Sequence, residues 1–122
     1  MNSEFNDFKI VAGEEAYVIS MVDEILNSIP TEFALGQNYP NPFNPVTKMD
    51  ISLPITGDVS LVIYNILGQK VRTLFSGELN YGYHTMQWNG LDDQGLRVSS
   101  GVYFSEFRSR DHRKTKKMLL LK

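Results

Sequence analysis

The sequence contains no cysteine among its 122 residues. This absence excludes disulfides, thiolate chemistry and cysteine-ligated zinc, and it leaves the compartment open, since a cysteine-free domain can work inside or outside the cell. No apolar run approaches the roughly 18 residues that a transmembrane helix needs, so we expect no membrane span. The beginning of the chain also lacks a basic stretch followed by an apolar block, so we expect no signal peptide here.

Catalytic and metal-binding groups are scarce as well. The two histidines, His84 and His112, fall in different predicted strands. Asp92 and Asp93 faintly resemble a calcium loop, but no bidentate glutamate follows, and Gly95 explains the motif as a tight turn. There is no glycine-rich phosphate loop before a helix and no Ser/His/Asp set with plausible spacing. We therefore expect no enzyme activity, metal or cofactor.

Charge is distributed unevenly, although its total is only −2. Residues 108–122 hold seven lysines and arginines against one aspartate, a balance of +6, which leaves −8 for residues 1–107. This split indicates either a basic tail for an acidic partner or a solvated edge strand protected by lysines. The tail lacks interleaved aromatics for stacking bases, so nucleic acid is not expected as a partner.

A period-two alternation of apolar and polar residues dominates the chain after residue 45. In "TKMDISLP", for example, Met49, Ile51 and Leu53 alternate with polar side chains, as in a half-buried strand. Similar segments, separated by turn residues, are predicted as strands at 8–12, 47–54, 59–65, 69–77, 83–90, 101–107 and 114–122. About seven short strands at this spacing predict an all-β, antiparallel immunoglobulin-like β-sandwich.

The first part of the chain is harder to interpret. Residues 13–29 have apolar residues at helical spacing but are also rich in β-branched residues. We interpret residues 1–32 as the tail of a preceding domain and a linker, and residues 33–122 as the folded domain. A monomer is expected, with a dimer through residues 8–29 as the alternative.

The segment "QNYPNPFNP", residues 37–45, excludes a helix and a central strand, because proline fixes φ and donates no hydrogen bond. It is predicted to be a stiff extended rod between the preceding chain and the sandwich. The residues expected to dock this linker onto the sandwich are Tyr39, Pro40, Pro42, Phe43 and Pro45.

Four stretches together resemble a known family. They are "FALGQNYPNPFNPVT" at 33–47, "VSLVIYNILGQKVRTL" at 59–74, "GYHTMQWNGLDDQGLRVSSGVYF" at 82–104 and "KTKKMLLLK" at 114–122. They resemble, in order, the C-terminal sorting domains of the type IX secretion system (type A, Por secretion family). The "WNGLDDQG…SSGVYF" part is also similar to the immunoglobulin-like domain of the flagellar hook-capping protein.

The resemblance implies a cargo signal without catalytic residues of its own. Such a domain directs an upstream cargo protein from the periplasm to the cell surface or medium, through an outer-membrane translocon and its shuttle. A sortase-like peptidase then removes the domain and anchors the cargo. On this interpretation the cut falls between Asn27 and Gln37, just before the rod.

The family's motifs are carried over position by position. The glycine-led turn matches Gly68, Gln69 and Val71, and the Gly-x-Tyr element matches Gly101 and Tyr103. The terminal basic and apolar element matches Lys116, Lys117, Met118, Leu119, Leu120, Leu121 and Lys122. As an edge strand, this last element is expected to offer its backbone to a receptor by strand addition, with lysines that steer an acidic partner.

Two other functions stay open. A structural module of the flagellar-cap type would tolerate a C-terminal extension and assemble with itself or with hook subunits. A carbohydrate-binding sandwich would need exposed aromatics on one face, which Tyr81, Tyr83 and Trp88 would supply, although burial of Trp88 is expected.

Overall fold

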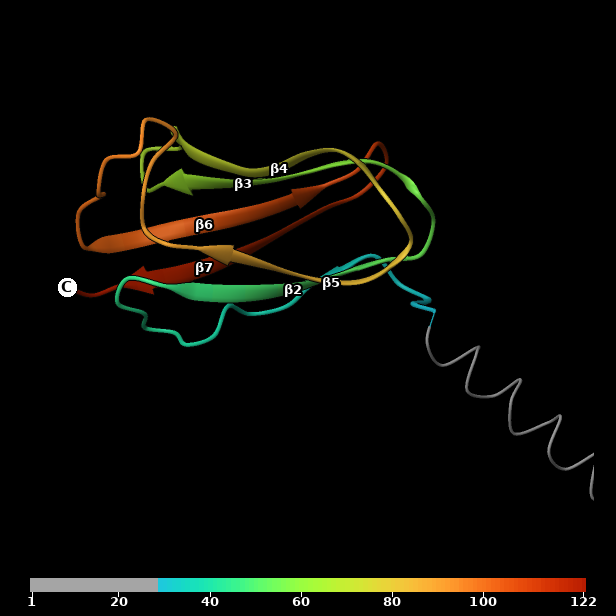
Figure 1. The fold of residues 1–122 in the computed structure, drawn as a ribbon, viewed down its shortest axis with the longest axis horizontal. Helices are drawn as coiled ribbons and strands as arrows, with labels where there is room; N and C mark the ends of the chain where they lie inside the picture. Colours follow the sequence, from blue (N-terminus) through green and yellow to red (C-terminus); the bar gives the residue numbers. More distant parts are fainter. Residues whose placement is uncertain (1–28) are drawn as a thin grey trace, which may run out of the picture.

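A computed structural model describes residues 29–122 of the chain, and Figure 1 shows two β-sheets packed face to face. All neighbouring strands pair antiparallel, in the orders β1-β2-β5 and β4-β3-β6-β7. The strands are β1 (Ala34–Leu35), β2 (Thr47–Leu53), β3 (Gly57–Asn65), β4 (Lys70–Leu79), β5 (Gly82–Trp88), β6 (Gly101–Arg108) and β7 (Arg113–Leu120). The predicted all-β sandwich is confirmed.

One strand of the predicted seven differs. Six of the predicted strands correspond to β2–β7, but the strand predicted at 8–12 lies outside the described residues. So do most of the ambiguous stretch 13–29 and the proposed dimer contact within 8–29. The seventh strand is instead β1, a two-residue strand at the start of the predicted folded domain, where no strand was predicted.

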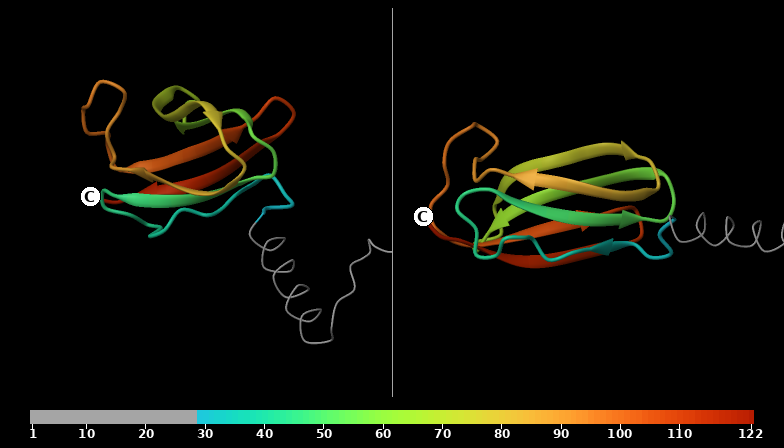
Figure 2. Two further views of the ribbon diagram at one scale, coloured as in Figure 1. Left: turned by 45° about the vertical axis from the view of Figure 1, so that its right-hand side comes forward. Right: turned by 60° about the horizontal axis from the view of Figure 1, so that its bottom comes forward.

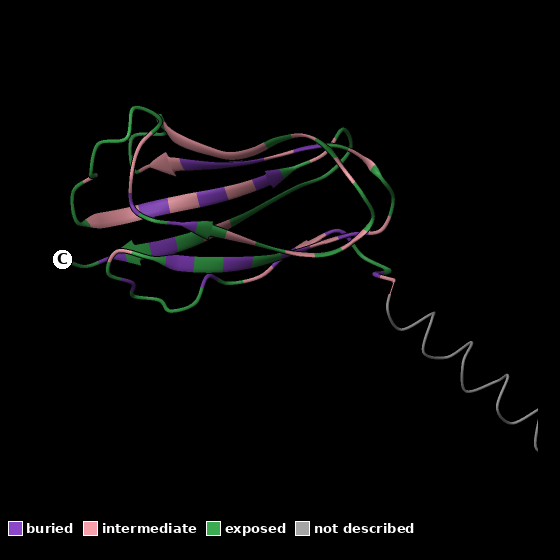
Figure 3. Ribbon diagram, viewed as in Figure 1, coloured by how far each residue is buried: buried purple, intermediate pink, exposed green. Residues whose placement is uncertain are grey.

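The alternation of apolar and polar residues in the sequence correctly indicates which side chains form the core. Met49, Ile51 and Leu53 of β2 are buried, and their polar neighbours face solvent (Figure 3). The two sheets bury an aromatic cluster between them, in which the Trp88 ring centroid lies 5.6 Å from that of Phe43 and 5.3 Å from that of Tyr103. Trp88 also donates a hydrogen bond from Nε1 to the Leu91 carbonyl at 2.9 Å, which satisfies its buried polar atom.

The sandwich has two distinct ends, visible in Figures 1 and 2. Residues 29–33 reach the body at one end, here named the upstream end, where the turn between β6 and β7 also lies. The opposite end, named the C-terminal end, carries the β3–β4 turn, the long connection from β5 to β6, and the end of the chain. Residues 29–33 and the C-terminal residues therefore lie at opposite ends of the sandwich.

Candidate recognition site

Strand β7, the last strand, forms one edge of the four-stranded sheet and has two different faces. Met118 and Leu120 point into the core and are almost completely buried. Lys117, Leu119 and Leu121 alternate with them and are exposed. The motif that was predicted as one recognition element therefore contributes two of its residues to the core, while most of the others are exposed.

The outer edge of β7 is already occupied at its C-terminal half. The Phe43 amide donates to the Leu119 carbonyl at 3.0 Å, and the Leu121 amide donates to the Phe43 carbonyl at 2.9 Å. The Asn41 Oδ1 atom accepts the Leu119 amide at 3.0 Å. The proline-rich segment thus takes the place that a further strand would occupy.

The prediction that the element Lys116 to Lys122 offers its backbone for strand addition is therefore wrong for the edge from Lys117 onward. Gln37 Nε2 donates to the Lys117 carbonyl at 2.8 Å, so the covered edge extends from Lys117 to the chain end. Because outward backbone groups alternate along an antiparallel strand, Arg113 and Thr115 face the same edge. Within residues 29–122, no hydrogen-bond partner covers their outward groups. Within the described residues, unpaired outward backbone groups on β7 are therefore confined to its first half.

The prediction that residues 37–45 form a stiff rod between the preceding chain and the sandwich is also wrong, because this proline-rich segment is part of the sandwich. Phe43 is buried in the core beside Trp88, and Asn38 is buried with its Nδ2 atom 2.9 Å from the Thr47 hydroxyl. The peptide bonds before all three prolines are cis. Phe43 docks the segment firmly, but the segment does not hold the sandwich away from the preceding chain.

Tyr39 docks more loosely, on the outer face of β2. Its backbone pairs with Lys48 through two hydrogen bonds of 2.8 and 2.9 Å, while its side chain remains 46% exposed. The hydroxyl donates to Asp50 Oδ1 at 3.0 Å. This hydrogen bond raises the pKa of Tyr39, because ionisation would place a second negative charge beside the carboxylate.

The other predicted linker-docking residues, the prolines, differ in exposure. Pro40 and Pro42 are exposed, and Pro45 is half-buried. Pro45 lies against Gly90, where an added Cβ would come within 3.2 Å of the proline ring.

The glycine-led turn lies at the C-terminal end, between β3 and β4. Gly68 has φ +80°, a conformation that favours glycine. Asn65 Oδ1 accepts the amides of Leu67 and Gln69 at 2.9 and 3.0 Å and so fixes the turn. Gly68 and Gln69 are exposed, whereas Val71 is half-buried and packs against the core.

The Gly-x-Tyr element has a structural position at the start of β6. Gly101 has φ +151°, at the margin of the region that favours glycine. Tyr103 is buried against Trp88, and its hydroxyl donates to the Ser99 carbonyl at 2.6 Å. Tyr103 therefore stabilises the β5–β6 connection. A partner protein would contact this connection rather than the buried tyrosine itself.

The structure nevertheless brings the three predicted motifs together. Gln69, Val71 and Tyr103 line one open pocket together with Asp92 and residues of the β5–β6 connection. At the chain end, the Lys122 amide donates to the Ser100 hydroxyl at 3.2 Å. All three motifs lie at the C-terminal end, although up to 54 residues separate them in the sequence.

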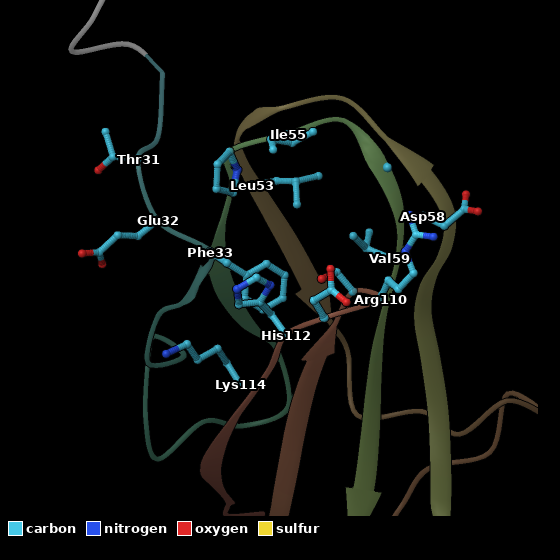
Figure 4. A pocket seen from close by; sticks show the side chains of 14 residues that line it. Thr31, Glu32, Phe33, Leu53, Ile55, Asp58, Val59, Arg110, His112 and Lys114 are labelled. Carbon is cyan, nitrogen blue, oxygen red and sulfur yellow. The ribbon is translucent and has the colours of Figure 1, made fainter.

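A second open pocket lies at the upstream end, where the chain joins the body (Figure 4). Phe33 is stacked on Phe107 at 4.4 Å between ring centroids, and His112 lies at 5.1 Å on Phe33. Thr31 and Glu32, just before Phe33, are exposed. Phe33 therefore holds the chain against the sandwich directly after the two exposed residues, although Pro30 before them is buried as well.

Of the residues considered for carbohydrate or metal binding, Trp88 and Asp92 stabilise the fold instead. Trp88 is fully buried and cannot serve a carbohydrate platform, although Tyr81 and Tyr83 are exposed. Asp92 Oδ1 accepts the amides of Gln94 and Leu96, so this carboxylate holds the turn. In the part of the chain that the structure describes, no group of three or more acidic, histidine or cysteine side chains could hold a metal ion.

Sequence reasoning missed the residues that attach the proline-rich segment to β7. Gln37 and Asn41 look like ordinary loop residues in the sequence, and their partners lie 80 and 78 positions away. No local pattern signals such a contact.

Among residues 29–122 no helix is long and apolar enough to cross a membrane.

The fold and the connectivity define an immunoglobulin-like β-sandwich. The family model for the FlgD Ig-like domain matches residues 43–108, which is more than half of the chain. The chain therefore belongs to the FlgD Ig-like domain family. No curated protein matches the sequence.

Three solved structures are similar to this chain to different degrees. PorU of Porphyromonas gingivalis, in a dimeric latent form, has a TM-score of 0.56 at 18% identity over 75% of this chain and 10% of PorU. FlgD of P. aeruginosa has a TM-score of 0.48 at 24% identity, over 61% of this chain and 57% of FlgD. PorZ of P. gingivalis, described as a surface component of the type IX secretion system, has a TM-score of 0.45 at 23% identity, over 74% and 11%. The chain thus spans little more than half of FlgD and about a tenth of the other two.

Proposed function

We propose that this chain is a C-terminal sorting domain of the type IX secretion system, which directs an upstream cargo from the periplasm across the outer membrane. The observation that carries the proposal is a contact between two segments. Residues 33–42 and 109–122 lie outside the FlgD Ig-like match and hold the most specific part of the resemblance. In the fold they bind each other, through Gln37 with Lys117 and Asn41 with Leu119.

The arrangement of the two ends supports this function. A sorting domain must present its signal while a folded cargo is attached, so the signal has to lie where the cargo does not cover it. The three motifs gather at the C-terminal end, and the described chain enters the body at the upstream end. The domain has no catalytic role of its own in this proposal.

Recognition would depend on side chains at the C-terminal end. Because the proline-rich segment covers the edge of β7 from Lys117 onward, a receptor meets the exposed side chains of Lys117, Leu121 and Lys122 and the turn at Gln69. The lysines favour an acidic receptor surface, which would steer the encounter.

The proposal also narrows where a sortase-like peptidase would cut. The window of Asn27 to Gln37 overlaps residues that the fold holds: Phe33 is stacked, and β1 is paired to β2. Proteases bind extended, accessible chain, so cleavage falls before Phe33. The released domain would then keep β1.

A secretion assay tests the proposal. A periplasm-exported fluorescent protein is fused to the full chain in a bacterium that has the type IX machinery, and external fluorescence is measured. Deletion of residues 116–122 would be a poor negative variant, because it removes Met118 and Leu120 from the core. The better variant adds a short Gly/Ser extension after Lys122, with the same insertion between Arg110 and Asp111 at the upstream end as the control.

The expected result is that the intact fusion and the control reach the surface or the medium while the extended fusion stays in the periplasm. Retention of the intact, folded fusion inside the cell would reject the sorting function.

A second candidate, favoured by the FlgD Ig-like family match, is a structural module of the flagellar-cap type. Such a module assembles through its own surfaces, so a C-terminal extension would be tolerated. Self-assembly of the purified chain into defined oligomers, with the extended form assembling equally well, would favour this candidate.

A further inference from the structure

The outer faces of the two sheets differ in polarity. On the three-stranded sheet the outward positions of β2 and β5 are polar or tyrosine: Lys48, Asp50, Ser52, Tyr83, Thr85 and Gln87. On the four-stranded sheet several outward positions are apolar and converge near the C-terminal end. We name this the outer patch, and it consists of the half-buried Tyr64, Val102 and Phe104 and the exposed Leu119.

The strand registers place these side chains next to one another. Tyr64 pairs with Phe104, and Val102 pairs with Leu119. Paired residues of antiparallel strands project to the same face. Figure 3 agrees, because β6 alternates between buried and half-buried positions, whereas β2 alternates between buried and exposed ones. The outward residues of an open antiparallel sheet are normally polar. Packing of the core therefore does not account for the apolar residues of the outer patch.

Positive charge borders the outer patch on both sides. The row that contains Tyr64 and Phe104 ends in Lys70 on one side and Lys117 on the other, and both lysines are exposed. Glu106, in the neighbouring row, is already 3.5 Å from both Arg108 and Arg113. The border is therefore cationic, and a complementary surface would be apolar in its centre and acidic at its rim.

We propose that the outer patch is a docking surface for an acidic-rimmed apolar surface on a protein of the secretion machinery, in addition to the C-terminal end. This inference rests on the proposed function. A second copy of this chain is the less suitable occupant, because it would bring the same lysines to the interface. The aromatic centre of this surface is separate from the exposed chain end, since Tyr64 and Phe104 belong to β3 and β6, and the two surfaces adjoin only at Lys117 and Leu119 of β7.

The fluorescent fusion of the full chain tests the outer patch. The double variant Tyr64→Ser and Phe104→Ser removes the aromatic centre, and Tyr83→Ser, an outward aromatic on the other sheet, is the matched control. Because the double variant removes half-buried groups, its fold is checked by thermal unfolding. Lys70→Glu, with Lys48→Glu as its control, changes only exposed charge and decides the question if the double variant does not fold.

We expect roughly a tenfold or larger loss of external fluorescence for the double variant, as for removal of an interface hot spot, and a several-fold loss for Lys70→Glu. Both controls should match the intact fusion. Normal secretion of folded double variant and of Lys70→Glu would overturn the outer patch while leaving the sorting function intact. Failure of the intact fusion would overturn both.

Light scattering completes the test. A dimer of the intact chain that becomes a monomer in the double variant would assign the outer patch to a second copy and overturn the proposed partner. A monomer in both forms agrees with docking to a different protein.

Discussion

Phe43 shows how much one residue of an apparent linker contributes. Its ring is almost fully buried beside Trp88, and its backbone groups bind both Leu119 and Leu121. The side chain therefore joins the proline-rich segment, the core and the last strand at a single position. A purely linking residue would have none of these contacts.

We predict that Phe43→Ala destabilises the domain by roughly 3–5 kcal/mol, because it removes a buried aromatic ring and leaves a cavity. Urea unfolding followed by tryptophan fluorescence measures this directly, since Trp88 is the sole tryptophan. Tyr81→Ala, at an exposed aromatic, is the control and should change stability by no more than about 0.5 kcal/mol. Equal effects of the two substitutions would contradict the burial of Phe43.

Tyr39 supports a prediction about pH. The hydrogen bond to Asp50 raises the pKa of Tyr39 above its ordinary value of 10.0 in the folded state. The folded state thus holds this proton more tightly than the unfolded state. The resulting contribution to stability is complete below pH 10 and is lost as the pH rises through the folded pKa.

An ultraviolet titration of phenolate formation, taken as the difference between the intact chain and Tyr39→Phe, isolates this group from the other five tyrosines. Asp50→Asn should lower the Tyr39 pKa toward its ordinary value. An unchanged titration in Asp50→Asn would show that the carboxylate is not the cause.

At the scale of elements, the edge of β7 is divided into a covered half and an open half. The division depends on Gln37, Asn41 and Phe43, which satisfy backbone groups from Lys117 onward. An edge that is blocked in this way is protected against uncontrolled pairing with other chains. The open half retains arginine and lysine side chains that have the same protective effect.

Amide hydrogen exchange tests this division. We predict that the amides of Leu119 and Leu121 are strongly protected, whereas those of Arg113 and Thr115 exchange quickly. In Asn41→Ala the Leu119 amide should lose protection more than the Leu121 amide, which remains bonded to Phe43. Equal protection along both halves of β7 would mean that the edge is covered throughout.

The sequence predicted most elements but not their long-range contacts. Strands such as β2 were predictable because alternation follows directly from one buried and one solvated face. β1 was missed because two residues are too few to show a period. The outer patch was missed because apolar residues stand at both parities in "LVIY" and "VYF", so the alternation that marks the core does not reveal a second apolar face.

The candidate site shows the same limit. Resemblance located the three motifs, and the strand order then showed that they converge on one end. Whether a motif residue points inward or outward depended on packing: Tyr103 and Met118 are core residues, whereas Gln69 and Lys117 are exposed. The attachment of Asn41 to Leu119 depends on contacts between distant parts of the chain, which local propensity does not encode.

At the scale of the whole molecule, the sandwich should behave as one resistant body that begins at Phe33. We predict that a glutamate-specific protease cuts after Glu32 and leaves residues 33–122 intact, because Glu78 and Glu106 lie in paired strands. Mass spectrometry identifies the fragment, and digestion in urea is the control in which the strand sites should become accessible. Early cutting at Glu78 or Glu106 under native conditions would contradict a single closed body.

The contact between the proline-rich segment and β7 also has a consequence for the speed of folding. The partners are separated by 78 to 80 residues, so loop closure must precede any gain from their hydrogen bonds. Contacts of this separation form late and make folding slow. Under the proposed function, the two most specific segments of the signal come together only when the sandwich closes. A partly folded sorting domain would therefore not be recognised by the secretion machinery.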